Sequence, residues 1–488
     1  MHVKSIPKSA VLTIAMRWSD RLIGLVSTIV LARLLVPVDF GIIVMASVVV
    51  GLIDVFINLG VSVALIHNNK ADHDDFNTAW TIRLIQCCLA GIVIYFSAPI
   101  AADYYNNLLV IDVLHVMALG VVIAGFENIG IVSFQKNMEF GKDFKFLFLR
   151  RFSGFVATMI AAFLLQSYWA MIIGALVGRI VGILLSYQMH PHRPQISFKN
   201  FSGIWSISKW VLLGNIGNYL DSETDKMLIG NRADAGMLGI YSVAKDISAM
   251  PTTEVLAPLG RVLFPAFVNK RDQPEIFVRG ISLAVGVQTL FAIPACIGLA
   301  LVADDAISVL LGSNWLQAAP LIQVMALTNL LIALAHTGGY ALLAIGKVEL
   351  LAVITWLKAI LFLGIAVLLF PTSDLVEIAE IRMLVVAAGT AVLMGTVVTQ
   401  IKVLGISDYF LPMFRPLLAS GLMAFLLIQL HAELISLSPI IRLIIEVMAG
   451  CLIYVTGILL LWIIQSCPKG AEAYLWEIIS EKFRKSVL

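Results

Sequence analysis

The sequence predicts an all-α polytopic membrane protein, and three observations support this. Of its 488 residues, 60% are hydrophobic and only 13% are charged, with a mean hydropathy of +0.95. A soluble domain has roughly 45 to 50% apolar and about 25% charged residues. Apolar runs close to the roughly 20 residues of a transmembrane helix recur along the whole chain. The loops between them are short, which leaves no room for a soluble domain.

Apolar length and loop punctuation predict about fourteen spans. Their ranges are 9–36, 38–66, 77–99, 108–134, 146–166, 168–189, 203–230, 236–266, 278–303, 318–345, 348–370, 382–404, 412–431 and 439–465. The first run is too long and too charged for a cleaved signal peptide, so we expect a retained span. The tail AEAYLWEIISEKFRKSVL is predicted to form an interfacial helix on the cytoplasmic side.

Basic residues predict the orientation of these spans, because Lys and Arg concentrate in cytoplasmic loops. With the N-terminus inside, the inward loops include QKNMEFGKDFK, HPHRPQISFK and VNKRDQPEIFVR. The outward loops PIAADYYNNLL, ADDAISVLLGSNW and PTSDLVEIAE carry no Lys or Arg. Both termini are therefore expected in the cytoplasm.

An internal repeat is indicated by two similar outward turns, ARLLVPVDFGII at 32–43 and GNRADAGMLGIY at 230–241. Gly41 aligns with Gly239, an offset of 198 positions. The same offset carries a polar helix face of the first span onto one of the seventh, aligning Arg17, Asp20, Gly24 and Ser27 with Asn215, Asn218, Ser222 and Asp225.

The repeat predicts two pseudo-symmetric six-helix lobes around a central cavity. We expect an N-terminal lobe at 1–200, a C-terminal lobe at 201–404, and two further spans with the tail at 405–488. Because the first and seventh spans run in the same direction, the lobes would be parallel repeats about an axis along the membrane normal. Transporters built in this way hold their substrate between the repeats.

Ionisable residues inside the predicted spans point to a polar cavity, since a charge at the bilayer centre costs about 2.5 to 3.5 kcal/mol on insertion scales. A rise of 1.5 Å per residue places six cations roughly 12 to 18 Å from a span end. They are Arg17, Arg21, Arg179, Lys209, Lys245 and Lys358. Such cations suit a phosphate. The alternative is internal ion pairing, of Arg17 or Arg21 with Asp20 and of Lys245 with Asp246 or Asp221.

The sequence lacks motifs for several kinds of chemistry. The five cysteines form no CxxC pair and have no metal-ligand spacing, so neither a metal nor a cofactor is expected. The GK pair at Gly346 and Lys347 lacks the upstream glycine of a phosphate loop. Transport would therefore run on an ion gradient or the membrane potential. The acidic stretch DHDD at 72–75 lies in a short inward loop, and we interpret it as solvated.

The opening ARLLVPVDFGIIVMASVVVGLIDVFINLGVSVALI resembles the bacterial polysaccharide transporter family, whose members are lipid-linked oligosaccharide flippases of the multidrug/oligosaccharidyl-lipid/polysaccharide exporter superfamily. The resemblance continues in SFQKNMEF, DKMLIGNRADAGMLGIYSVAKDIS and RVLFPAFVNKRDQPE, and is greatest to the colanic-acid or teichuronic-acid exporter branch. One departure is NTAWTIRLIQ in the third span, where Arg83 replaces the aromatic-rich start of other members.

The resemblance implies an undecaprenyl-pyrophosphate-linked oligosaccharide as substrate, moved across the bacterial inner membrane for exopolysaccharide or capsule synthesis without enzymatic chemistry. A polysaccharide polymerase and a chain-length regulator are the implied protein partners, with no nucleic acid. Three alternatives stay open. These are a cation-coupled multidrug antiporter, a peptidoglycan-precursor flippase and, with less support from the short outward loops, a polysaccharide polymerase or ligase.

The site hypothesis assigns residues from the predicted polar helix faces. Arg17, Arg21, Lys209 and Lys245 would bind the pyrophosphate; Asn58, Asn215, Asn218 and Tyr241 would bind the sugars; and Asp20, Asp54, Asp221 and Asp225 are candidates for ion coupling. Rocking of the lobes would expose the site to each side of the membrane in turn.

Overall fold

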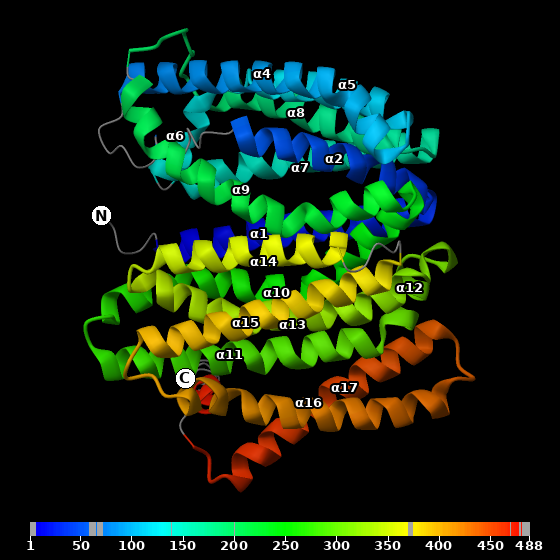
Figure 1. Ribbon diagram of the computed structural model, residues 1–488, viewed down its shortest axis with the longest axis vertical. Helices are drawn as coiled ribbons and strands as arrows, with labels where there is room; N and C mark the ends of the chain where they lie inside the picture. Colours follow the sequence, from blue (N-terminus) through cyan, green and yellow to red (C-terminus); the bar gives the residue numbers. More distant parts are fainter. Residues whose placement is uncertain are drawn as a thin grey trace. The chain divides into compact units, whose positions relative to one another are not determined.

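A computed structural model of the chain describes residues 6–57, 65, 72–137, 139–199, 201–368, 374–468, 470–477 and 480. Side chains are described for all of these except 6–18, 20, 201–214, 254–258 and 261. The described residues are helical apart from short connections (Figure 1). The chain divides into two compact units, Met1–Ile240 and Tyr241–Leu488.

The first unit is built from long helices. They are α1 (Ile6–Leu34), α2 (Pro37–Ile57), α4 (His73–Tyr105), α5 (Leu109–Ala124), the 3-10 turn η2 (Ile129–Ile131), α6 (Val132–Lys136), α7 (Phe140–Leu165), α8 (Trp169–Met189), α9 (Phe201–Arg232) and the first turn of α10 (Ala235–Lys270). Within this unit α7 packs along α8 and α1, α4 packs along α5, and α2 packs on α9.

The second unit holds the rest of α10 and the remaining helices. They are α11 (Pro274–Leu301), α12 (Ala303–Leu310), the 3-10 turn η3 (Ser313–Trp315), α13 (Ala318–Ala344), α14 (Val348–Leu368), α15 (Leu375–Gln400), α16 (Ile406–Leu434) and α17 (Pro439–Ile464). Here α13 packs on α15 and α11, and α16 joins α11 to α17.

Helix ends follow the local sequence. Asp72 caps the start of α4, where its side chain accepts a hydrogen bond from the Asp75 amide at 2.9 Å and its own amide donates to the Asp75 carboxylate at 3.0 Å. This capping box gives the acidic stretch at 72–75 a structural role beyond a solvated loop. Asn106 and Gln166 end α4 and α7 with φ of 51° and 47°, the left-handed conformation typical of a helix end.

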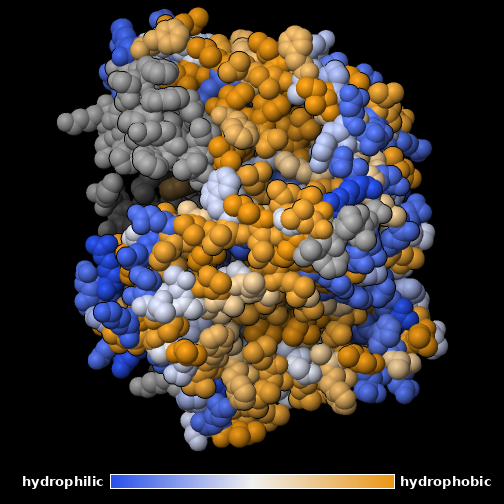
Figure 2. Space-filling model, in the orientation of Figure 1, coloured by the Kyte–Doolittle hydropathy of each residue, from blue (hydrophilic) through white to orange (hydrophobic). Residues whose placement is uncertain are grey.

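Each of the fourteen predicted spans overlaps one of these helices, or the bent pair of α5 with η2 and α6 for 108–134. Ten of the described helices are long and apolar enough to cross a membrane, or eleven if the bent pair counts as one span. α1, α9 and α10 are not among the ten, and all three carry ionisable residues. The total of fourteen stays a prediction. Figure 2 shows apolar side chains over the middle of the face in view and hydrophilic ones towards its left and right margins.

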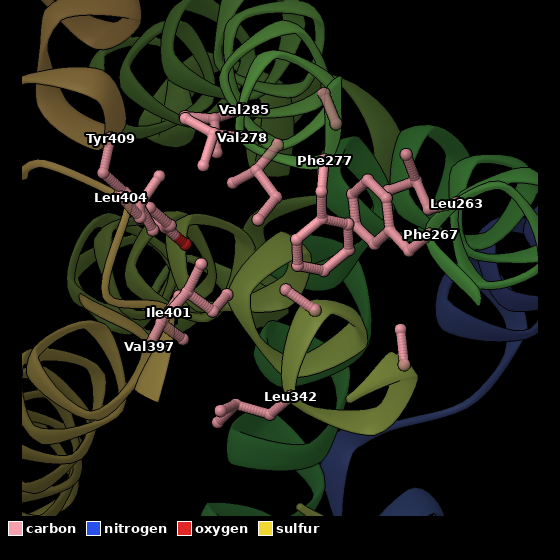
Figure 3. Close-up of a cluster of buried hydrophobic side chains, with 14 of the residues drawn as sticks. Leu263, Phe267, Phe277, Val278, Val285, Leu342, Val397, Ile401, Leu404 and Tyr409 are labelled. Carbon is pink, nitrogen blue, oxygen red and sulfur yellow. The ribbon is translucent and has the colours of Figure 1, made fainter. Parts of the chain in front are cut away.

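A hydrophobic cluster holds one end of the second unit together (Figure 3). Its buried side chains come from α10, α11, α13, α15 and α16. Phe267 and Phe277 meet edge to face with their ring centroids 5.5 Å apart. The Tyr409 hydroxyl, which would be costly to bury without a partner, donates to the Leu334 carbonyl at 3.1 Å.

A segment without helix or strand, His190–Lys199, leads from α8 towards α9 and lies against α4. The Gln195 amide donates to the Asn77 side-chain carbonyl, and the Ser197 amide donates to the Thr81 hydroxyl, each at 3.0 Å. Asn77 and Thr81 lie one turn apart in the first turns of α4. Side chains of α4 therefore pair with part of the polar backbone of a segment that is neither helix nor strand.

Candidate functional site

A cluster of arginines lies inside the first unit, on three different helices. Arg83 belongs to α4, Arg150 to α7 and Arg179 to α8, and each lies ten residues from one end of its helix. At 1.5 Å per residue, this depth is about 15 Å. On the predicted topology all three ends face the cytoplasm, so the three guanidinium groups would share one depth in the membrane.

Glu127 joins two of these arginines. Its Oε2 accepts a hydrogen bond from Arg150 Nη1 at 2.9 Å, and its Oε1 accepts one from Arg83 Nη2 at 3.4 Å. The glutamate is 4% exposed, whereas the arginine side chains retain 34% and 26% exposure. A buried carboxylate is thus shared between two cations that can still be reached from outside the pair.

Glu127 is placed by a break in the fourth predicted span. α5 ends at Ala124, and the next helical segment is bent by 68°. Asn128 fixes this break, because its amide donates to Ser186 Oγ at 3.0 Å and its side-chain nitrogen donates to the His192 carbonyl at 2.7 Å. Irregular backbone at membrane depth is found where it is buried in protein or lines a water-filled cavity, and broken helices often form transport sites.

Glycines let α7 and α8 pack closely, and this packing brings Arg150 of α7 and Arg179 of α8 onto adjoining surfaces. A Cβ on Gly154 of α7 would lie 3.0 Å from the Gly174 carbonyl oxygen and 3.5 Å from the Gly178 Cα. A Cβ on Gly182 would lie 3.0 Å from Cδ of Arg150. The glycines of α8 therefore form a ridge against which α7 packs closely.

Arg179 adds positive charge that the pair with Glu127 does not balance. Within the described part of the chain it forms no hydrogen bond or ion pair, and the charged groups that act on it are Arg150 and Asp54. Its guanidinium lies against α5, where a Cβ on Gly120 would lie 2.5 Å from Nη1. Three neighbouring arginines, two of which share one buried glutamate, suit a multiply charged phosphate, which guanidinium groups bind through paired hydrogen bonds.

The predicted site residues divide between the two units. The side chains of Arg17, Asp20 and Lys209, and the whole of Asn58, lie outside the described residues. In the first unit Arg21, Asn215 and Asp221 are half-buried, Asp54 and Asn218 are exposed, and Asp225 is 2% exposed with the Lys226 amide donating to its carboxylate at 2.9 Å. In the second unit Lys245 is half-buried and Tyr241 is 1% exposed. The shared site predicted for these residues stays a prediction.

Sequence reasoning missed Arg150 and its pairing with Glu127. The available signal was FLFLRRF at 146–152, two adjacent arginines within an otherwise apolar predicted span. The pairing itself could not be read from the sequence, because Glu127 lies 44 residues from Arg83 and 23 from Arg150.

One further cluster offers potential metal ligands in the second unit. Asp305, His431 and Glu446 bring one ligand atom each to within 4.8 Å of the others. However, Arg442 donates to both carboxylate oxygens of Asp305, and His431 Nδ1 lies 2.7 Å from Glu446 Oε1. The geometry favours an ion pair and an adjacent hydrogen bond, which together join α12, α16 and α17, over a metal centre.

Comparison with known proteins places this arrangement in a family. The family described as "Polysaccharide biosynthesis protein" matches residues 30–320, which include every member of the arginine cluster. The chain belongs to this family. The resemblance inferred from the sequence is therefore confirmed.

Curated relatives extend the match over most of the chain. The teichuronic acid biosynthesis protein TuaB of Bacillus subtilis is 25% identical over 409 residues, which cover 82% of this chain and 84% of TuaB. The lipopolysaccharide biosynthesis protein WzxC of Escherichia coli is 23% identical over 345 residues, or 70% of each chain.

A solved structure of the lipid II flippase MurJ, in an inward closed conformation, shares the fold. It superposes with a TM-score of 0.76 at 14% sequence identity, covering 93% of this chain and 99% of that one. Together with the apolar helices, these matches establish a multi-pass membrane protein of the polysaccharide biosynthesis family.

Proposed function

We propose that this protein is a flippase that moves an undecaprenyl-pyrophosphate-linked oligosaccharide repeat unit across the bacterial inner membrane for exopolysaccharide or capsule synthesis. The observation that carries the proposal is the group of three neighbouring arginines, each ten residues from one end of its helix, with a single buried glutamate beside two of them. A pyrophosphate brings the negative charge that this group lacks.

Family membership supports the same conclusion. The matched family acts in polysaccharide biosynthesis, and the relatives TuaB and WzxC are named for teichuronic acid and lipopolysaccharide biosynthesis. The resemblance seen in the sequence implies a lipid-linked precursor with an anionic pyrophosphate head group. A transport role requires no catalytic group, and the arginine cluster offers the chemistry of anion binding.

In the proposed topology both termini are cytoplasmic and the substrate enters from the inner leaflet. Lobes at 1–200 and 201–404 would rock about the site, with the last two spans at 405–488 beside them. The polar faces that carry Arg17, Arg21, Lys209 and Lys245 would extend the binding surface for the head group. A polymerase would use the repeat unit on the outer side.

The test is flipping of a labelled lipid-linked oligosaccharide in proteoliposomes, with and without a proton or sodium gradient. Arg150→Gln and Arg179→Gln should each slow flipping roughly tenfold or more, because a hydrogen bond to a charged group contributes about 1.5 to 3 kcal/mol. Lys142→Gln is the matched control, since its pair with Glu139 is exposed and lies at the start of α7. Equal rates for all three variants would contradict the proposal.

The same preparation separates the alternatives. A drug antiporter would move cationic dyes and would be unaffected by loss of the arginines, whereas a peptidoglycan-precursor flippase would move lipid II in preference to the oligosaccharide repeat unit. Either result would replace the function proposed here.

A further inference from the structure

We propose that Glu127 is a built-in competitor of the substrate. It holds Arg83 and Arg150 when no pyrophosphate is bound, yields them when the head group arrives, and takes them back as the head group leaves. This inference rests on the proposed function and adds a residue that controls release. Glu127 is a positioning residue, because it acts through the two arginines and need not touch the substrate itself.

The Glu127 carboxylate contacts the two guanidinium groups in the way that a bound anionic ligand would. Each carboxylate oxygen accepts from a different guanidinium group, as two oxygens of a phosphate would. The two donors come from α4 and α7, so the glutamate spans the same gap that a bound head group would span.

The two hydrogen bonds are unequal, which gives the exchange an order. The bond from Arg150 is 2.9 Å long, within the usual range for N–H···O. The bond from Arg83 is 3.4 Å long, beyond that range. Arg83 is therefore the arginine that gives up Glu127 first, and an arriving phosphate would meet Arg179 and Arg83 before it displaces the bond to Arg150.

The backbone of Glu127 stays in place while its side chain gives way. The neighbouring Asn128 is bonded to Ser186 and to the backbone of His192, and the Glu127 amide donates to the Ala124 carbonyl at 3.3 Å. A carboxylate on a fixed backbone returns to the arginines without any rearrangement of the fold.

A transporter needs such a competitor because its site must release what it binds. Three arginines in a low-dielectric surrounding would hold a pyrophosphate tightly, and tight binding to the resting site slows turnover. A negative charge of the protein's own, placed against the same arginines, weakens the bound state and speeds departure. Binding favourable enough for entry and weak enough for exit is the same balance that ion channels require.

The experiment compares Glu127→Gln with Arg150→Gln in nanodiscs, using inorganic pyrophosphate as the probe. Glu127→Gln should lower the Kd for pyrophosphate about tenfold and slow oligosaccharide flipping, since release becomes limiting. Arg150→Gln should weaken pyrophosphate binding and also slow flipping. The two variants therefore move affinity in opposite directions and turnover in the same direction.

Glu472→Gln is the matched control, because Glu472 forms a half-buried pair with Arg415 at 3.2 Å in the second unit. It should leave the Kd for pyrophosphate unchanged. Glu127→Asp provides a second variant that keeps the charge on a shorter arm. It should lower the Kd less than Glu127→Gln does, and it decides the question if Glu127→Gln does not fold.

The outcomes distinguish this inference from the function on which it rests. If Arg150→Gln binds pyrophosphate as well as the unchanged protein, the arginine cluster is not the head-group site and the proposed function loses its support. If Arg150→Gln loses binding while Glu127→Gln and Glu127→Asp bind no more tightly than the unchanged protein, Glu127 is only a structural counter-ion. That second result overturns the inference alone.

Discussion

Gly41 and Gly239 pack against each other's helices in a reciprocal contact. A Cβ on Gly41 would lie 2.9 Å from the Ala235 Cα, and a Cβ on Gly239 would overlap the Pro37 carbonyl and lie 2.9 Å from the Gly41 amide nitrogen. The offset of 198 that aligns Gly41 with Gly239 also aligns Pro37 with Ala235. Gly41 therefore meets Ala235, and Gly239 meets Pro37, the residue that the offset aligns with Ala235. The two contacts are related by the repeat, which supports the internal repeat inferred from the sequence.

Gly41→Ala should destabilise the protein by about 1 to 3 kcal/mol, because the new methyl group would overlap the backbone of α10. Gly395→Ala is the control, since no atom lies within 4 Å of its added Cβ. Alanine within a helix is favoured over glycine by up to about 1 kcal/mol, so the control should be neutral or slightly stabilising. Thermal unfolding in detergent measures both, and equal midpoints would show that the contact tolerates a side chain.

Reversing the charge of Arg17 and Lys245 together should abolish polymer export while the protein still reaches the membrane. An anionic head group would then meet carboxylates where the hypothesis places cations. Export in a deletion strain and membrane abundance by immunoblot give the two readings. Normal export at normal abundance would remove these residues from the site and leave the arginines of α4, α7 and α8 as its cationic part.

The ion pair of Asp305 and Arg442 should be tightly coupled, because the Asp305 side chain is only 4% exposed. Arg442→Gln alone leaves a buried carboxylate without its cation, which costs about 3 to 5 kcal/mol. Adding Asp305→Asn should recover much of that loss. A double-mutant cycle on the unfolding midpoint measures the coupling, and additive losses would indicate that the two side chains do not interact.

Acid should destabilise the segment between α8 and α9. The pKa of His192 is lowered from 6.5 to about 4, first by burial and then by His73, His190 and Arg193. The folded state therefore binds the proton less readily than the unfolded chain. The stability contribution is complete above pH 6.5 and is lost as the pH falls towards 4.

His192→Phe tests this origin, since it keeps a ring beside His73, whose centroid lies 4.5 Å away, but cannot titrate. Its unfolding midpoint should depend less on pH between 6.5 and 4 than that of the unchanged protein. Parallel curves for the two proteins would assign the acid sensitivity to other groups.

The helices could be predicted because length and hydropathy decide them locally. Range 439–465 corresponds to Pro439–Ile464, and 168–189 to Trp169–Met189. Range 77–99 falls short of His73–Tyr105, because the polar residues at the two ends of α4, HDD at 73–75 and DYY at 103–105, are typical of loops. The break after α5 was missed, since the apolar run continues through Gly125 and Phe126 without a proline. α12 was read as loop because its eight residues are too few to span a membrane.

The site was harder to predict because pairing between distant helices decides it. Depth within a span identified Arg179 as unusual and departure from the family identified Arg83, but only packing brings Glu127 to Arg83 and Arg150. The four predicted cations were chosen by depth along single helices, and depth alone does not fix which way a side chain points.

The tethered connection His190–Lys199 limits where the chain can be altered. Splicing an epitope or a fiducial domain into it would break the hydrogen bonds to Asn77 and Thr81, and protease digestion there should be slow despite its lack of helix. Residues 436–438, between α16 and α17, are exposed and offer a gentler place for such a graft. An inserted tag or domain is therefore best placed between α16 and α17.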